Sequence, residues 1–180
     1  MKQESTFGYI LRLTVTLLLI CGAVAAVLAG VNAITKEPIA AIQAQKTQDA
    51  IAAVLPGAQN VEALPLSGDT GIVSAVYGSE SGYAVEVAPV GFDGEVTMMV
   101  GVADGAVTGI SVISHTETPG LGAVAAANNA KGEAFRGQFV GQSGELRVGD
   151  QIDGMSGATI TSKAVVAGVN AALEYVENLG

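Results

Sequence analysis

An uninterrupted apolar run near the N-terminus places the strongest constraint on how this chain folds. Residues 13–34 read LTVTLLLICGAVAAVLAGVNAI and contain no charged side chain. About 22 such residues are enough to cross a hydrocarbon core of about 30 Å as an α-helix. The AVA at residues 23–25 is compatible with signal cleavage, but the run is longer than a secretory signal needs. We expect an uncleaved transmembrane helix over residues 13–34, with a cleaved signal peptide as the alternative.

The few charges that flank this span favour one orientation. Lys2 and Arg12 precede it. Lys36 follows it and is offset by the adjacent Glu37. Because positive charge next to a span favours the cytoplasmic side, we expect residues 1–12 to form a cytoplasmic tail. The rest of the chain is then expected outside the cytoplasm, on a single-pass anchor in the inner (cytoplasmic) membrane.

The charges and reactive side chains of the whole chain exclude several classes of function. With 17 acidic and 8 basic residues the net charge is −9, which disfavours nucleic-acid binding. Cys21 and His115 are the only cysteine and the only histidine. An internal disulfide, an iron–sulfur cluster held by this chain alone and a zinc site of His/Cys type are therefore excluded. We expect no metal site and no catalytic residues.

Beyond the span, a helical connector is expected to lead to a separate domain. Residues 35–57 have apolar side chains at loose helical spacing, and Pro38 suits a first helical turn. The Pro-Gly pair at residues 56–57 is expected to end this helix. Residues 58–180 then form the predicted extracytoplasmic domain.

The first half of this domain predicts an antiparallel meander. Three strand-like segments, YAVEVAPVG, VTMMVGVA and AVTGISVIS, follow one another along the chain. Asp93-Gly94 and Asp104-Gly105 separate them, and Asp-Gly is a strong tight-turn dipeptide between apolar runs.

Helices are expected to cover one face of this meander, because an exposed apolar sheet face is not stable in water. The candidates are residues 122–140 and 160–179, and the second places Val165, Val169 and Leu173 on one stripe. The predicted fold class is α+β, with an N-terminal transmembrane helix and one domain in which helices cover an antiparallel sheet.

Two loops rich in small residues are the candidate sites. HTETPGLGA, residues 115–123, follows the third strand, and its proline and glycines let the backbone turn sharply and approach a ligand. Spacing alone favours the simpler interpretation that these residues only shape a connection between a strand and a helix.

The second loop is DGMSGATITS, residues 153–162. Ser156 or Thr159 is expected to cap a helix that begins near Thr161 or Ser162. Free N–H groups at a helix start suit a phosphate, although the loop lacks the glycine spacing of a nucleotide P-loop or a dinucleotide fold. Spacing alone leaves both a plain helix cap and an anion site open.

Together, the two loops resemble the motifs of a known family. SGAT at residues 156–159, preceded by Asp153-Gly154, resembles the flavinylation motif of the FMN-binding domain in Rnf complexes and in sodium-pumping NADH:quinone reductases. ETPGLG at residues 117–122 is similar to a second motif, which lies along the flavin in that family. The order of the motifs, their separation and the single N-terminal span also agree, so the resemblance covers essentially the whole chain.

The resemblance implies a covalent cofactor. In this family the FMN phosphate is esterified to the threonine that ends SGAT, which here is Thr159. A separate flavin transferase forms the bond and recognises Asp153 and the small residues around it. Thr161 and Ser162 carry nearby hydroxyls that are suited to hydrogen-bond the phosphate. The implied cofactor-binding residues are Asp153, Ser156, Gly157, Ala158, Thr159 and Thr161 in one loop and Glu117, Thr118, Gly120 and Leu121 in the other.

The function implied by the resemblance is electron transfer inside a membrane complex. The short chain resembles the G subunit of the Rnf complex, which couples ferredoxin:NAD⁺ electron transfer to Na⁺ or H⁺ translocation. Its partners would be other membrane, flavin and iron–sulfur subunits, and no stand-alone catalysis is expected. The longer C subunit of a sodium-translocating NADH:quinone reductase is the nearer alternative. A membrane-anchored, non-redox binding or assembly module is the alternative from another class.

Overall fold

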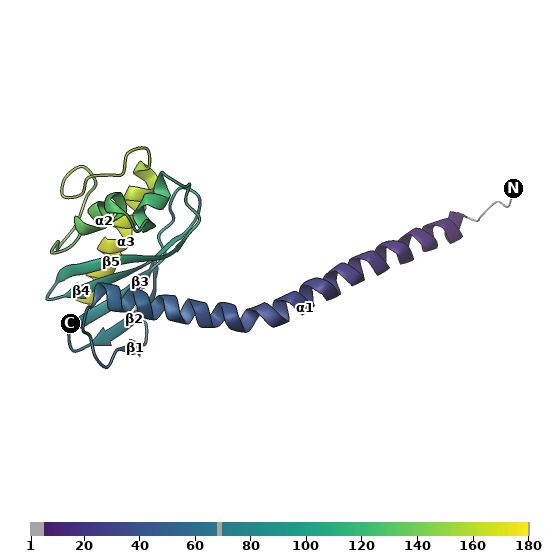
Figure 1. Ribbon diagram of the computed structural model, residues 1–180, viewed down its shortest axis with the longest axis horizontal. Coiled ribbons are helices and arrows are strands. Elements are labelled where there is room, and N and C mark those ends of the chain that lie inside the picture. The colour runs from purple at the N-terminus through teal and green to yellow at the C-terminus, as the bar shows by residue number, and fades with distance from the viewer. Residues whose placement is uncertain (1–5, 68–69, 180) are drawn as a thin grey trace. The chain divides into compact units, whose positions relative to one another are not determined.

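The computed structural model describes residues 6–67 and 70–179, which separate into two compact units. The first unit is Met1–Gln45 and the second is Lys46–Gly180. One long helix, α1 (Thr6–Val54), begins in the first unit and ends in the second (Figure 1). Lys2, on which the predicted orientation partly depends, lies outside the described residues.

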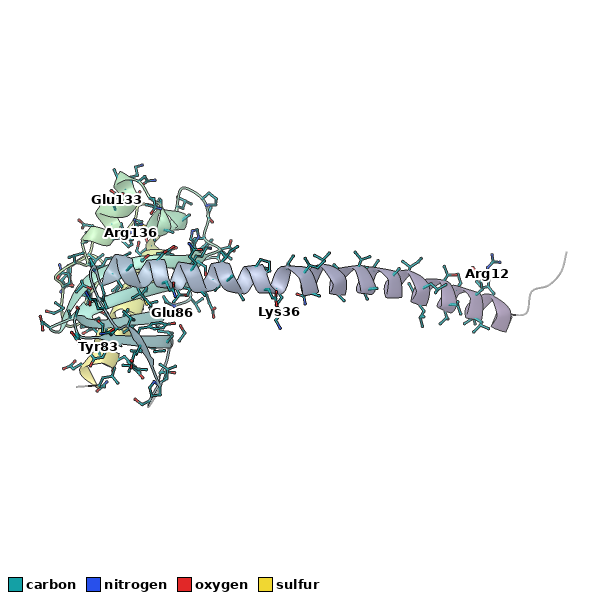
Figure 2. All side chains as sticks on the ribbon, turned by 60° about the horizontal axis from the view of Figure 1, so that its bottom comes forward. Arg12, Lys36, Tyr83, Glu86, Glu133 and Arg136 are labelled. Carbon is teal, nitrogen blue, oxygen red and sulfur yellow. The ribbon has the colours of Figure 1, made fainter. Side chains whose placement is uncertain are left out.

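Within the first unit, α1 has the length and composition needed to cross a membrane. Its long uncharged stretch lies between Arg12 and Lys36, which Figure 2 shows at the two ends of this stretch. The hydroxyls of Thr14 and Thr16 donate to the carbonyl oxygens four residues earlier, at 3.0 and 2.8 Å. Polar groups in a lipid-facing helix need such internal partners, because the hydrocarbon offers none.

One continuous helix, α1, contains both the residues predicted as the anchor and most of those predicted as the connector. Pro38 lies inside α1, rather than in the first turn of a second helix. A proline inside a helix removes one backbone hydrogen bond. The helix nevertheless continues on both sides of it, because helical sequence precedes and follows.

The second unit is built around one antiparallel sheet with the strand order β1-β2-β3-β4-β5. Its strands are β1 (Glu62–Leu64), β2 (Val73–Ser79), β3 (Gly82–Val87), β4 (Val96–Ala103) and β5 (Ala106–His115). The meander predicted for the last three strands is confirmed, and so is the α+β class. The sequence did not predict strands β1 and β2, which extend the sheet. Their signals are weak, because β1 is very short and a bulge between Val73 and Ala75 interrupts the alternation of β2.

Helices after the sheet cover one of its faces. They are the 3-10 helix η1 (Gly122–Ala126), α2 (Ala130–Gly137) and α3 (Thr159–Glu177). Asn129 divides the first predicted helix into two, because its side chain accepts hydrogen bonds from Lys131 N and Gly132 N and so starts α2. Val165 and Val169 of α3 pack in the main core with Met98 and Val100 of β4.

The last turns of α1 cover the opposite face of the same sheet. Ile51 and Val54 form a second apolar cluster with Ala84, Met99 and Ile113. Because successive strand residues point to opposite faces, β4 is buried on both sides, which its almost continuous apolar sequence reflects. The end of the expected connector therefore contributes to the core of the domain.

Gly101 allows this close approach between α1 and the sheet. A Cβ atom at Gly101 would overlap the carbonyl oxygen of Val54 and the hydroxyl of Thr108. The Thr108 hydroxyl donates to that same carbonyl, at 2.5 Å. Any side chain at this position would therefore displace the end of α1.

We predict that Gly101→Ala lowers the free energy of unfolding by about 1–3 kcal/mol, as expected for an overpacked core. Gly137→Ala is the matched control, because a Cβ there meets open space at the end of α2. It should change the free energy of unfolding by less than about 1 kcal/mol. Denaturant unfolding of the full chain in detergent measures both, and equal stability of the two variants would contradict the packing described here.

Candidate functional site

Three segments far apart in the sequence surround a cavity of about 340 Å³. They are the connection between β3 and β4, the loop that follows β5, and the start of α3. The lining residues are Phe92, Glu117, Thr118, Leu121, Gly122, Gly157, Ala158, Thr159, Ile160 and Thr161. The cavity therefore brings together the two loops that the sequence analysis selected. Asp153, Ser156 and Gly120 are not among these lining residues.

Glu117 connects the three segments through its carboxylate, and the residue is only 4% exposed. Its Oε1 accepts hydrogen bonds from the backbone N–H groups of Phe92, at 2.7 Å, and Asp93, at 3.3 Å. Its Oε2 accepts from the hydroxyl of Thr161, at 2.7 Å. Both carboxylate oxygens are thus used by protein donors, which satisfies a buried charged group in the way such groups require.

Two glycines provide the space that this carboxylate occupies. A Cβ at Gly91 would overlap Glu117 Oε1, and a Cβ at Gly122 would overlap Glu117 Oε2. The last glycine of ETPGLG is therefore explained by the position of Glu117. Gly120 has a different role: its φ of +78° allows the tight turn in which Leu121 N and Ala123 N donate to Thr118 O.

The start of α3 gives three neighbouring hydroxyls different environments. Thr159, the first residue of the helix, is exposed, and its hydroxyl makes no hydrogen bond within residues 6–67 and 70–179. Thr161 is 1% exposed and donates to Glu117. Ser162 is fully buried and donates to Ala158 O at 2.9 Å.

The predicted helix cap is wrong. Ala158 is the N-cap residue of α3, and no side chain among the described residues caps the helix. The helix begins at Thr159, earlier than expected, because Thr161 and Ser162 direct their hydroxyls into the domain and hold the first turn from inside. The Ser162 hydroxyl also accepts from Met155 N at 2.9 Å, which closes the SGA turn that precedes the helix.

The backbone before this turn is held independently of Glu117. Asp153 N donates to Gln138 Oε1 at 2.7 Å, and Gln138 Nε2 donates to Asp153 O at 3.3 Å. Asp153 and Ser156 are both exposed. The structure therefore places both outside the cavity, on the surface next to it.

The uncapped helix start is suited to an anion. Within the described residues, the backbone N–H groups of Thr159, Ile160 and Thr161 have no hydrogen-bond partner. Such groups, with the positive end of the helix dipole, favour a phosphate. The free hydroxyl of Thr159 lies at the same helix end, so an ester phosphate on its oxygen would be next to these donors.

Apolar side chains project from the wall of the cavity. Phe92 is 68% exposed, Ile160 is 54% exposed and Leu121 is 44% exposed. Large apolar side chains gathered around a cavity are typical of a ligand site. Phe92 and Ile160 were not predicted. The only signal for Phe92 was its own position as an apolar residue beside the Asp93-Gly94 turn. Nothing in the sequence connects that turn to the loop after β5.

A second, larger cavity of about 1020 Å³ lies among the β2–β3 turn, the β4–β5 turn and the C-terminal end of α3. Its charged lining residues are all acidic: Glu80, Asp104, Glu145, Glu174 and Glu177. An acidic wall repels a phosphate group. The smaller cavity, with its helix start, is therefore the better candidate for a nucleotide cofactor.

Comparison with known proteins identifies the family. Residues 91–174, which include the whole smaller cavity, match the model of the FMN-binding domain. The chain is 33% identical to the G subunit of the Na(+)-translocating ferredoxin:NAD(+) oxidoreductase complex of Acetobacterium woodii, over 99% of this chain and 97% of the relative. It is 33% identical to the G subunit of the ion-translocating oxidoreductase complex of Methanosarcina acetivorans, over 93% and 94%.

A third relative agrees with these two. The chain is 34% identical to the G subunit of the proton-translocating ferredoxin:NAD(+) oxidoreductase complex of Clostridium ljungdahlii, over 97% of this chain and 93% of the relative. All three alignments extend over nearly the full length of both proteins, anchor and domain together. The chain therefore belongs to the family of G subunits of the ion-translocating (Rnf-type) oxidoreductase complexes, which contains the FMN-binding domain.

Proposed function

We propose that this chain is the membrane-anchored flavoprotein subunit of an Rnf-type complex that couples ferredoxin:NAD⁺ electron transfer to Na⁺ or H⁺ translocation. Three observations support this proposal: similarity over nearly the full length to G subunits of such complexes, an apolar N-terminal helix, and the cavity at the start of α3. Bound FMN would supply reversible electron transfer, and the chain would relay electrons between the other membrane, flavin and iron–sulfur subunits. It performs no reaction on a substrate of its own.

The proposal includes a covalent bond between FMN and Thr159. The observation that supports it most is the exposure of that residue at the cavity, with no internal hydrogen bond to its hydroxyl within the described residues. The other two hydroxyls of this helical turn, on Thr161 and Ser162, are buried and donate to internal acceptors. Among these three, Thr159 alone is available for modification without unfolding the turn.

The ester bond requires an activated donor. The Thr159 Oγ1–phosphorus bond forms, the hydroxyl proton is released, and a leaving group must depart from phosphorus with its electron pair. FMN itself would have to lose hydroxide, a poor leaving group, so we propose a flavin dinucleotide, in which a phosphoanhydride joins FMN to AMP. The anhydride bond breaks, AMP leaves, and the net gain in mass is that of FMN less one water. A flavin transferase is the partner that catalyses this transfer.

The residues around Thr159 have separate tasks in this proposal. The free N–H groups at the start of α3 hold the ester phosphate. Phe92, Leu121 and Ile160 give the flavin ring an apolar wall that excludes water, while the exposed Asp153 and Ser156 face the transferase during maturation. Gly157 keeps its φ of +76° and leaves room for Leu121, whose Cδ2 would lie 3.0 Å from any Cβ there.

The attachment site is tested by co-expressing the chain with a flavin transferase and examining the denatured protein. The wild type and Thr159→Ser should be fluorescent and heavier by FMN less one water. Thr159→Ala should lose both signals completely, because the acceptor oxygen is removed. If Thr159→Ala keeps the full mass increase, the flavin is attached elsewhere, with exposed Ser156 as the next candidate. If the wild type takes up no flavin, the chain is a non-redox module.

The domain is proposed to lie outside the cytoplasm, with the N-terminus inside and a single membrane crossing. A Cys21→Ala, Ser143→Cys variant tests this, because Ser143 is exposed on the domain. A membrane-impermeant maleimide should label it in right-side-out membrane vesicles and leave it unlabelled in inside-out vesicles. The reverse pattern would contradict the proposed orientation. The Cys21→Ala variant alone is the control and should stay unlabelled in both preparations.

A further inference from the structure

We propose that Glu117 and Thr161 form a positioning pair that presents the Thr159 hydroxyl for flavin attachment. This inference rests on the proposed function, because it assigns a role to residues that act on the proposed acceptor. Neither residue supplies the acceptor oxygen. Glu117 acts through Thr161, and Thr161 acts by fixing the rotation of the first turn of α3.

Helix geometry determines where the hydroxyls of the first turn of α3 point. Residues two positions apart in an α-helix point about 200° away from each other around the axis. The Thr161 hydroxyl is directed into the domain by its 2.7 Å hydrogen bond to Glu117 Oε2. When Thr161 points inward, Thr159 must point outward, which agrees with their burial: Thr161 is buried and Thr159 exposed. This hydrogen bond therefore acts together with the buried Ser162 to orient the turn so that the Thr159 hydroxyl is accessible.

On the cavity side, this turn is held to the rest of the domain by buried side chains and by the Glu117–Thr161 hydrogen bond. In the part of the chain that the structure describes, no side chain caps α3, and uncapped helix ends fray. Ser162 closes the preceding turn through Met155 N and Ala158 O, all within the same local segment. Within the described residues, the Glu117–Thr161 hydrogen bond is the one side-chain hydrogen bond that joins this helical turn to the loop after β5.

Glu117 itself is held rigidly in the domain. Its other oxygen is held by two backbone N–H groups of the β3–β4 connection, Phe92 N and Asp93 N. The backbone at Gly91 and Gly122 packs closely against both carboxylate oxygens, where even a Cβ atom would not fit. A carboxylate near a helix start is also favoured by the helix dipole. Thr161 therefore bonds to an acceptor that has little freedom to move.

The test measures the rate at which purified full-length apoprotein in detergent gains flavin from flavin adenine dinucleotide and flavin transferase. Thr161→Val removes the hydroxyl and keeps the shape, whereas Thr161→Ser keeps the hydroxyl. We expect kcat of the transferase to fall at least about tenfold for Thr161→Val, because small misplacement of a reacting atom is costly. Thr161→Ser should stay within about threefold of the wild type, since its hydroxyl can reach the same carboxylate.

Several readouts separate positioning from simple loss of folding. KM should change little, because Gln138 holds the exposed recognition segment at Asp153 independently of Glu117. The slow variants should still reach full flavin content, whereas a misfolded fraction would give wild-type rates with an incomplete end point. Glu117→Ala should be as slow as Thr161→Val, and the double variant no slower than either, because residues that act as one unit are not additive.

Three outcomes would overturn the inference and leave the proposed function intact. They are a wild-type rate for Thr161→Val, equal slowing by Thr161→Ser and Thr161→Val, and an incomplete end point at a normal rate. If Glu117→Ala does not fold, the two Thr161 variants decide the question alone. A wild-type protein that gains no flavin would instead contradict the proposed function, so the two failures are distinguishable.

Discussion

The site depends on the hydrogen bonds that the buried carboxylate of Glu117 accepts. It joins segments that lie 25 residues before it and 44 residues after it in the chain. A buried charge without partners is expensive, so the carboxylate requires its donors in place, and the donors belong to the segments that line the cavity. The same requirement explains the glycines at positions 91 and 122, where a Cβ would occupy the space of its oxygens.

The sheet and the end of α1 supply the rigid frame behind this carboxylate. Strand β4 is buried on both faces, by α3 on one side and by the last turns of α1 on the other. The loops of the site connect elements whose positions this frame fixes. The short turn and the uncapped helix start at the site are therefore kept in place, although the loops form no large core of their own. Anchor and domain are joined by one helix, whose C-terminal end is itself part of the domain.

The sequence predicted the parts of the fold that local signals determine. Asp-Gly turns between apolar runs identified β3, β4 and β5, and a clear stripe identified α3. The role of Val54 depends on contact with Gly101 and Thr108, which no local pattern reveals. The cap was predicted incorrectly because propensity favours Ser and Thr at the N-cap, whereas here Thr159 is already the first helical residue and Ala158 occupies the N-cap position. Phe92 was not predicted, since only the fold brings its loop to Glu117.

The proposed covalent bond makes one oxygen, the hydroxyl of Thr159, the acceptor for FMN. Trypsin cleaves after Arg147 and Lys163, so residues 148–163 form a single peptide that contains every hydroxyl of this turn. Tandem mass spectrometry of that peptide from flavin-loaded wild-type protein assigns the added mass to one residue. We predict that all of the added mass is on Thr159. Added mass on Ser156, Thr161 or Ser162, or on any other peptide, would contradict it.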